Sequence, residues 1–298
     1  MNTVMYHYVR NYDKLYPNFK FLKKKSFLNQ IKNFENTLGI ISKKSEIYKC
    51  PNKFLLTFDD GLKDHYEAAK ILKKRGHIGI FFIPTFPYIK NKILDVHMIQ
   101  LITSKMKSED LMNELNFFLK KNNLKYIYEN FVKKEFKKRI YTRDLDEIVK
   151  FKTFLNYEAS PMIRKKIINY FSKKLNIRIK AKNFYLSKKN IIKMKKMGMI
   201  IGSHGFSHQI MSRLTLKQQN IELKSSKEYL EKMINSEVDF FCYPYGKSFT
   251  YNDRTFDLLK KNKFKLSFAA ITRKTTKKDL SFNKYALPRH DTNFFIRS

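Results

Sequence analysis

Leu55-Leu56-Thr57-Phe58-Asp59-Asp60-Gly61 sets the interpretation of the whole chain. A mostly apolar, β-rich run leads directly into two adjacent carboxylates, which is typical of a strand that stays buried to its last residue. An isolated carboxylate costs several kcal/mol to desolvate unless it is paired, hydrogen-bonded or bound to a metal. The sequence therefore predicts that Asp59 and Asp60 lie at the end of a strand, in a site that compensates their charge.

Two imidazoles follow another apolar run. Met199-Ile200-Ile201 precedes Gly202-Ser203-His204-Gly205-Phe206-Ser207-His208, in which the histidines are four residues apart. Asp60, His204 and His208 would offer a metal one oxygen and two nitrogens. This donor set suits Zn²⁺, which we expect, with Co, Ni or Mn as the alternatives. Asp59 is left to accept the proton of a water held at the metal, so we expect it to be the general base.

The segments around these motifs alternate between strand and helix patterns. We expect strands at 4–9, 54–58, 78–83, 199–201, 239–243, 264–271 and 284–287, and helices at 27–38, 64–75, 187–197, 215–234 and 253–261. This rhythm predicts a parallel sheet or barrel, in which reactive groups gather at the carboxyl ends of the strands. Residues from about 90 to 186 instead show apolar positions at helical spacing, which predicts a helical insertion.

The amino-acid composition limits which binding partners and which cellular compartment we expect. The 298 residues include 62 Lys and Arg against 26 Asp and Glu, a net charge of +36. The lysines are scattered along the chain, which disfavours a nucleic-acid role and leaves peripheral contact with an anionic membrane as the expectation. Cys50 and Cys242 are the only cysteines, and no run reaches the ~18 apolar residues of a membrane span. We therefore expect a cytoplasmic protein, peripheral to the inner face of the membrane.

Three motifs in order resemble the polysaccharide deacetylase family, a carbohydrate esterase type with a NodB-homology domain. They are Thr57-Phe58-Asp59-Asp60-Gly61, His204-x-x-x-His208 and Phe241-Cys242-Tyr243-Pro244-Tyr245-Gly246, and the resemblance covers residues 1 to about 90 and 185–295. It implies an α/β fold, a distorted (β/α) barrel of about seven parallel strands, with residues 1–298 as a single catalytic domain that a helical insertion at about 90–186 interrupts.

The same resemblance assigns roles to individual residues. Asp59 is the base, Asp60, His204 and His208 bind the metal, and the backbone N–H of Tyr245 holds the oxyanion.

Two positions depart from the family pattern. Cys242 stands where relatives often have an arginine that orients the catalytic aspartate, so we expect Arg289, in Leu287-Pro288-Arg289-His290-Asp291, to supply that charge. The general acid is expected to be His7 of the Tyr6-His7 pair, as in some relatives, with His290 as the alternative. The family's usual tryptophan motif is absent, since the chain contains no Trp.

These features together predict metal-dependent hydrolysis of an N-acyl group, acetyl before others, from an amino sugar in surface-glycan, lipopolysaccharide or capsule biosynthesis. The expected substrate is an N-acetylated sugar that is nucleotide-linked or lipid-linked. One alternative is a deformylase or another non-peptide C–N amide hydrolase of the same fold. The other alternative is a non-catalytic glycan- or membrane-binding relative. The departures from the family pattern, namely Cys242 and the absent tryptophan motif, favour this alternative, whereas the complete set of Asp59, Asp60, His204 and His208 disfavours it.

Overall fold

The structure is a computed structural model of the 298-residue chain, and it describes residues 1–133 and 144–295. The chain divides into two compact units. The first comprises Met1–Asn11, Phe21–Lys92 and Lys180–Ser298, and the second comprises Tyr12–Lys20 and Ile93–Ile179.

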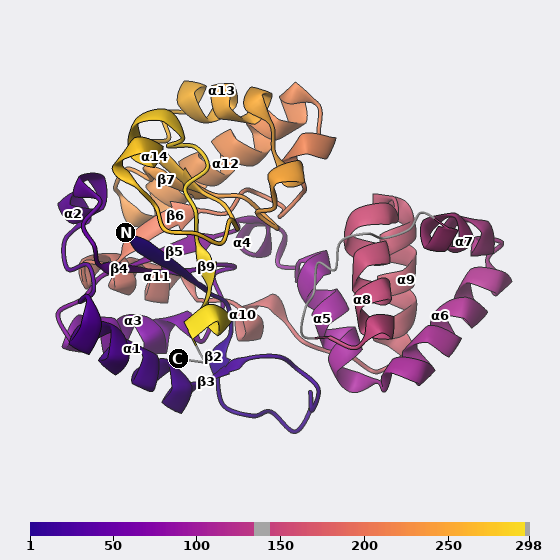
Figure 1. Cartoon of the computed structure of the whole chain (residues 1–298). Helices are drawn as coiled ribbons and strands as arrows, with labels where there is room; N and C mark the ends of the chain where they lie inside the picture. The colour runs from indigo at the N-terminus through magenta and orange to yellow at the C-terminus, as the bar shows by residue number, and fades with distance from the viewer. Residues whose placement is uncertain (134–143, 296–298) are drawn as a thin grey trace. The chain divides into compact units, whose positions relative to one another are not determined.

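A parallel sheet forms the centre of the first unit (Figure 1). Within the described residues it has seven strands in the order β8-β7-β6-β5-β4-β1-β9. The strands are β1 (Asn2–Tyr6), β4 (Phe54–Phe58), β5 (Gly79–Ile83), β6 (Ile200–Ser203), β7 (Phe240–Cys242), β8 (Leu266–Phe268) and β9 (His290–Asp291). A separate short parallel pair joins β2 (Val9–Arg10) to β3 (Leu22–Lys23). The predicted fold class, a distorted (β/α) barrel of parallel strands, is confirmed.

Helices cover one face of this sheet (Figure 1). They are α1 (Lys24–Thr37), α3 (His65–Lys74), α11 (Lys188–Lys196), α12 (Leu216–Ile234) and α13 (Asp253–Lys261). Their apolar stripes form one core with the outward side chains of the strands, as Phe27 and Ile31 do with Phe58. A capping box of Thr215 and Gln218 starts α12. The described part of the unit also contains four shorter α-helices, α2 (Lys44–Lys49), α4 (Phe86–Lys90), α10 (Ala181–Phe184) and α14 (Lys277–Phe282). Short 3₁₀ turns lie at Met211–Arg213, Ser248–Thr250 and Thr292–Phe295.

The opposite face of the sheet lines the inside of the barrel. Leu55, Phe82, Phe240 and Cys242 belong to a second core on this face. Because successive side chains of a strand point to opposite faces, Leu55, Thr57 and Asp59 share the inner face of β4. The regular alternation of this strand therefore carries Asp59 to the mouth of the barrel.

The prediction of a strand at 284–287 is wrong. Leu287 forms only an isolated parallel bridge with Phe268 of β8, and the last strand comes later, at β9, where His290 pairs with Val4 of β1. Pro288 has no amide hydrogen to donate, which interrupts the ladder, and Arg289 then donates its N–H to the carbonyl of Ile271, just after β8, at 3.0 Å. The segment 287–291 thus connects β8 to β1 and places Arg289 between them.

The second unit is helical in its described part. It contains α5 (Asp95–Lys105), α6 (Ser108–Lys121), α7 (Lys125–Lys133), α8 (Asp146–Thr153), a π-helical turn at Phe154–Glu158 and α9 (Pro161–Lys174). These elements bury a core of their own, which includes Leu115 and Phe171. The unit ends at Ile179 rather than near 186, and it also takes in Tyr12–Lys20, which the sequence pattern did not indicate. That the two units form a single catalytic domain stays a prediction.

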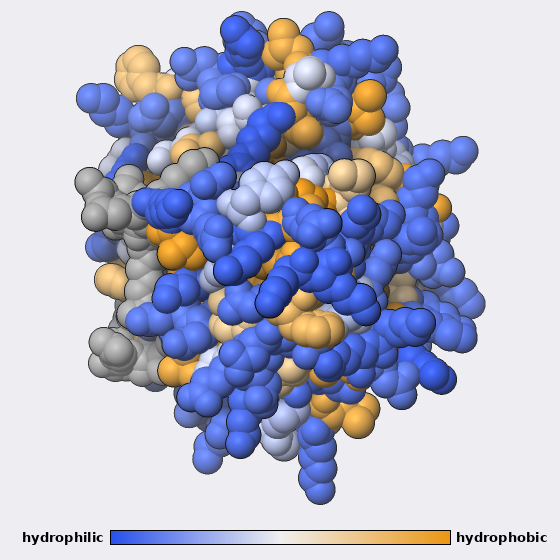
Figure 2. Space-filling view, turned by 90° about the vertical axis from the view of Figure 1, so that its right-hand side faces the viewer, coloured by the Kyte–Doolittle hydropathy of each residue, from blue (hydrophilic) through white to orange (hydrophobic). Residues whose placement is uncertain are grey.

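The exposed residues are mostly hydrophilic on the face that Figure 2 draws. Figure 2 shows one face on which hydrophilic side chains predominate and hydrophobic ones form small separate groups. Of the helices in the described ranges, none has the length and apolarity needed to cross a membrane.

Candidate active site

The predicted site residues of the first unit gather where its parallel strands end. Asp59 and Asp60 follow β4, His204 follows β6, and His7 follows β1 directly. Tyr245 lies shortly after β7. This is the end of a (β/α) barrel at which reactive groups are held by the loops that follow the strands.

Asp60, His204 and His208 form a compact, buried set of metal-ligand atoms. Asp60 Oδ1 lies 3.5 Å from His204 Nε2 and 3.4 Å from His208 Nε2. All three ligand atoms lie within 4.8 Å of one another. Two ligands at about 2.0–2.1 Å from a tetrahedral Zn²⁺ are themselves about 3.3 Å apart, so the set fits a divalent cation.

The ring of His204 is oriented by a second contact. Its Nδ1 lies 2.8 Å from the carbonyl oxygen of Cys242, and because a carbonyl only accepts, Nδ1 carries the proton. Nε2 is therefore the nitrogen that faces Asp60, and it would offer its lone pair to a bound cation, as in metal-binding histidines that a backbone carbonyl holds. Burial lowers the pKa of His204, but the bond to Asp60 and the charge of Asp59 outweigh burial and hold the pKa well above its ordinary value. The negative charge of Asp60 and Asp59 that favours a proton on His204 would also attract a divalent cation at this position.

Three site residues other than glycine adopt the left-handed backbone conformation. Their φ angles are +79° at Asp60, +59° at His208 and +64° at Tyr245. Such conformations cost about 1–3 kcal/mol each and persist only where the surrounding fold imposes them. At Asp60 the consequence is direct: an extended residue would point to the face opposite Asp59, whereas the left-handed turn lets both carboxylates serve one site.

Asp59 is held by a buried, bidentate pair with Arg289. Nη1 of Arg289 donates to Oδ1 and Nη2 to Oδ2, both at 2.8 Å. The remaining donors of the guanidinium are also used, since Nε reaches the carbonyl of Ala269 at 3.3 Å, Nη1 reaches Thr57 Oγ1 at 3.1 Å and Nη2 reaches Cys242 Sγ at 3.0 Å. All five N–H groups of Arg289 thus have partners. These partners compensate for the burial of the guanidinium, whose side chain is only 1% exposed.

The guanidinium determines the charge state of Asp59. Burial would raise the pKa of this carboxyl, but the attraction and hydrogen bonds of Arg289 hold it below the ordinary value, so Asp59 is ionised at neutral pH. Burial also raises the pKa of the Cys242 thiol, which therefore stays neutral beside the pair. The structure places the guanidinium of Arg289 against Cys242, the residue expected at the position of the family's arginine.

Of the two histidines considered as general acid, only His7 faces the carboxylates. Its Nε2 lies 4.0 Å from Asp60 Oδ2, and its side chain is 38% exposed at the mouth of the barrel. His290 pairs with Val4, whose side chain packs in the helix-covered core, and its ring lies 4.8 Å from that of Phe294. Because neighbouring residues of a strand face opposite sides, His290 points away from the inner face that Arg289 occupies.

Tyr245 lies in a tight turn beside the metal ligands. Gly246 donates its N–H to the carbonyl of Pro244 at 2.8 Å, and a Cβ at Gly246 would lie 2.8 Å from the backbone nitrogen of Ala270. The Tyr245 ring packs edge-on against His208 with centroids 4.9 Å apart. The turn thus lies close enough to the donor set for the predicted role of its backbone N–H, which stays a prediction.

Glu222 supports the loop between the two histidines, and it belongs to none of the three sequence motifs. Its carboxylate accepts hydrogen bonds from the backbone N–H of Ser207, at 2.8 Å, and from the Ser207 hydroxyl. Gly205 has a φ of +77°, and a Cβ there would come within 3.1 Å of Glu222 Oε2. The available signal was a charged side chain on the apolar stripe of a helix, next to Leu223, which indicates a buried partner.

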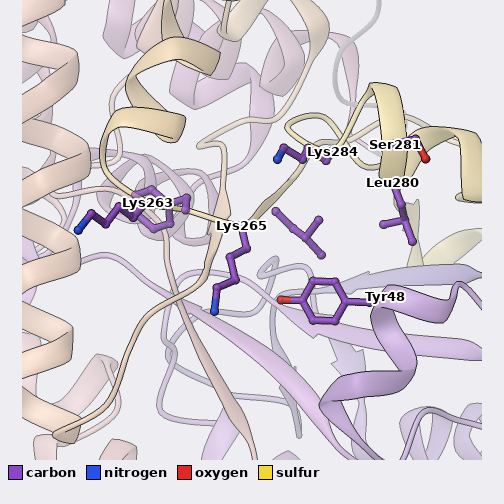
Figure 3. A pocket seen from close by; sticks show the side chains of 8 residues that line it. Tyr48, Lys263, Lys265, Leu280, Ser281 and Lys284 are labelled. Atoms are coloured by element: carbon purple, nitrogen blue, oxygen red, sulfur yellow. The ribbon is translucent and has the colours of Figure 1, made fainter.

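A surface cavity of about 550 Å³ lies elsewhere in the first unit, where β8 begins. Figure 3 shows that Tyr48, Lys263, Lys265 and Lys284 contribute to its lining. Lys265 is paired there with Asp239 at 2.8 Å. The amino ends of barrel strands contribute to stability rather than to chemistry, so this cavity is separate from the candidate site.

The fold and the donor set define a class of protein: a (β/α) barrel with an Asp-His-His set that fits a cation and an ionised aspartate next to it. Residues 162–267 match the family model described as polysaccharide deacetylase. The predicted resemblance to the polysaccharide deacetylase family is thereby confirmed. No curated protein sequence matches the chain.

Solved deacetylase structures share this fold. The Streptococcus pyogenes deacetylase PplD in complex with acetate has a TM-score of 0.59 at 17% identity, over 98% of this chain and 91% of that chain. A Bacillus cereus polysaccharide deacetylase has a TM-score of 0.56 at 17% identity, over 97% of this chain and 64% of that chain. IcaB from Ammonifex degensii has a TM-score of 0.52 at 14% identity, over 97% of this chain and 90% of that chain.

Proposed function

We propose that this protein is a metal-dependent hydrolase that removes an N-acyl group, acetyl before others, from an amino sugar. The observation that carries the proposal is that a set of metal-ligand atoms and an ionised carboxylate lie next to each other at the mouth of one barrel. Asp60, His204 and His208 offer a cation site, and the adjacent Asp59 is kept ionised by Arg289. Hydrolysis of an amide needs both elements, because the carbonyl must be polarised and a water must lose a proton.

Each residue has a defined part in this proposal. A divalent cation held by Asp60, His204 and His208 supplies Lewis acidity, and Zn²⁺ is the metal we expect, with Co, Ni or Mn as alternatives. The Asp59 carboxylate accepts the proton of the attacking water, and Arg289 orients it. The backbone N–H of Tyr245 donates to the oxygen on which charge develops. His7 Nε2 delivers the proton that the departing nitrogen needs.

We further propose that the substrate is an N-acetylated sugar that is nucleotide-linked or lipid-linked, in surface-glycan, lipopolysaccharide or capsule biosynthesis. The net charge of +36 supports this choice, since both kinds of carrier bear phosphate groups. The same charge supports peripheral contact with an anionic membrane, at the inner face of which a cytoplasmic enzyme would meet lipid-linked sugars.

The test combines metal analysis with a product screen. The purified protein is assayed for bound metal and then for acetate or formate release from nucleotide-linked and lipid-linked N-acetyl and N-formyl sugars. Acetate from at least one substrate, abolished by chelation and restored by Zn²⁺, would support the proposal. Formate alone would favour the deformylase alternative. A metal-free protein that releases neither acid would overturn it.

Two variants separate the roles within the site. Asp59→Asn keeps the size of the side chain and the donor set, so it should retain the metal and lose turnover. His204→Ala should lose both. Full activity of Asp59→Asn would remove Asp59 from the role of general base.

A further inference from the structure

His65 makes a buried hydrogen bond to the residue that carries the proposed general acid. It is the first residue of α3 and is fully buried. Its Nε2 lies 2.7 Å from the carbonyl oxygen of His7, which is 58 residues away in the sequence. A carbonyl can only accept, so Nε2 carries the proton. Burial also lowers the pKa of His65 to about 4, so the ring is neutral at physiological pH.

The surroundings of His65 offer no other reason for an imidazole. Its ring packs against Phe58 at 5.5 Å and Phe81 at 6.0 Å between centroids. Its Nδ1 is buried and, among the described residues, finds no hydrogen-bond partner. A buried polar atom without a partner costs free energy, which a phenylalanine in this aromatic setting would not incur. The bond to His7 is therefore the one polar gain visible at this position within the described chain.

The same end of α3 holds the chain that follows His7. Asp64, the residue before His65, accepts a hydrogen bond from Arg10 Nε at 2.6 Å. On the other side, Leu22 donates its N–H to the carbonyl of Tyr8 at 2.9 Å. The segment 7–10 is thus anchored at successive residues, and His65 holds the point closest to the metal ligands.

We propose that His65 is a positioning residue, which fixes the His7 backbone so that the His7 imidazole faces the reacting amide. The proposal rests on the proposed function, in which His7 protonates the leaving nitrogen. His7 Nε2 lies 4.0 Å from Asp60 Oδ2, and its side chain is partly exposed, so its own contacts restrain it weakly. A displacement of about 1 Å in a catalytic group can cost about 100-fold in rate.

The test uses two substrates that differ in their need for an acid. The amide substrate is the N-acetylated sugar from which the protein releases acetate in the product screen, and it leaves an amine that must be protonated. The ester 4-methylumbelliferyl acetate instead leaves a phenolate that departs without a proton. His65→Phe fills the aromatic pocket but lacks the donor, and His65→Gln retains an N–H at the end of a flexible side chain. Both variants are compared with the wild type, each with and without His7→Ala, in the Zn²⁺-loaded full chain.

The expected pattern is specific to positioning. His65→Phe should lower kcat on the amide substrate about 10- to 100-fold and leave its KM and the hydrolysis of the ester unchanged. It should have no further effect in the His7→Ala background. His65→Gln should recover most of the rate. Equal loss on both substrates, or a full additional loss in the His7→Ala background, would show that His65 acts on stability alone and would overturn the proposal.

A second measurement does not depend on activity. Nitrogen-15 NMR of the histidine rings should show His65 as the neutral Nε2–H tautomer at pH 7 in the wild type. A charged ring or the Nδ1–H tautomer would overturn the proposal. If the wild type releases no acid from any sugar in the product screen, the proposed function fails by that result, and the NMR measurement still decides whether His65 donates to His7.

Discussion

Replacing Arg289 by methionine should convert Asp59 from an ionised to a protonated side chain. Methionine has a similar length and no charge, so it removes the guanidinium without opening a large cavity. Asp59 would then keep its burial and lose both 2.8 Å hydrogen bonds. Removal of one partner of a buried ion pair costs about 3–5 kcal/mol, so we expect a loss of this size in the free energy of unfolding at pH 7.

The loss should depend on pH with a defined sign. In the wild type the pKa of Asp59 lies below its ordinary value, so its ionisation stabilises the fold above the unfolded pKa of about 3.9, and this contribution is lost as pH falls through the folded pKa. In Arg289→Met the attraction of the guanidinium, which is the largest influence that opposes burial, is gone, so burial raises the pKa of Asp59. Ionisation of Asp59 in the unfolded chain then destabilises the fold as pH rises above about 4. The difference between the two proteins should therefore be small near pH 3 and largest near neutrality.

The assay is urea unfolding between pH 3 and 8 with a chelator present, so that metal binding does not contribute. The double variant Asp59→Asn with Arg289→Met is the control, since it removes both charges and should be more stable at pH 7 than Arg289→Met alone. In the metal-loaded protein, the acidic limb of kcat/KM should move to higher pH in Arg289→Met. A loss below about 1 kcal/mol at pH 7, or one that does not change with pH, would refute the reasoning.

Three further outcomes are expected. Glu222→Ala should weaken Zn²⁺ binding about 10-fold in a calorimetric titration, because Ser207 loses its support; Glu222→Gln is the matched control, and unchanged affinity in the alanine variant would count against the role. Gly202→Ala should cost about 1–3 kcal/mol in urea unfolding, since the new Cβ would lie 2.5 Å from Cδ1 of Phe82, and a neutral result would contradict this packing. Zn²⁺ at 100 times its Kd should raise the free energy of unfolding by about 2.7 kcal/mol in the wild type and not in His204→Ala.

The sequence predicts the limits of a strand or helix correctly where residues within the same segment mark its ends. The strand at 54–58 was predicted with its observed limits, because an apolar run ends at two aspartates. The helix at 253–261 was likewise predicted with the limits that the structure shows. The order of Asp59, Asp60, His204 and His208 at strand ends followed from the same logic, and the structure brings these four together.

The remainder depends on pairings between distant parts of the chain. Whether 284–287 or 290–291 forms a strand is decided by which sheet edge each segment meets, and no local pattern contains that information. The choice between His7 and His290 likewise depends on which face of a strand each one occupies. Glu222 and His65 act through single hydrogen bonds to loops far away in sequence, so neither belongs to a recognisable motif.

The segment 287–291 has a consequence for the order in which the molecule is assembled. Arg289 and Asp59 are separated by 230 residues, so the ribosome releases the proposed base long before its partner. Until this segment joins β8 to β1, the sheet keeps two open edges and Asp59 has no guanidinium beside it. Closure of the barrel and ionisation of the base are therefore expected to be one event. A folding intermediate that lacks this last connection should be inert, and the onset of activity should report completion of the fold.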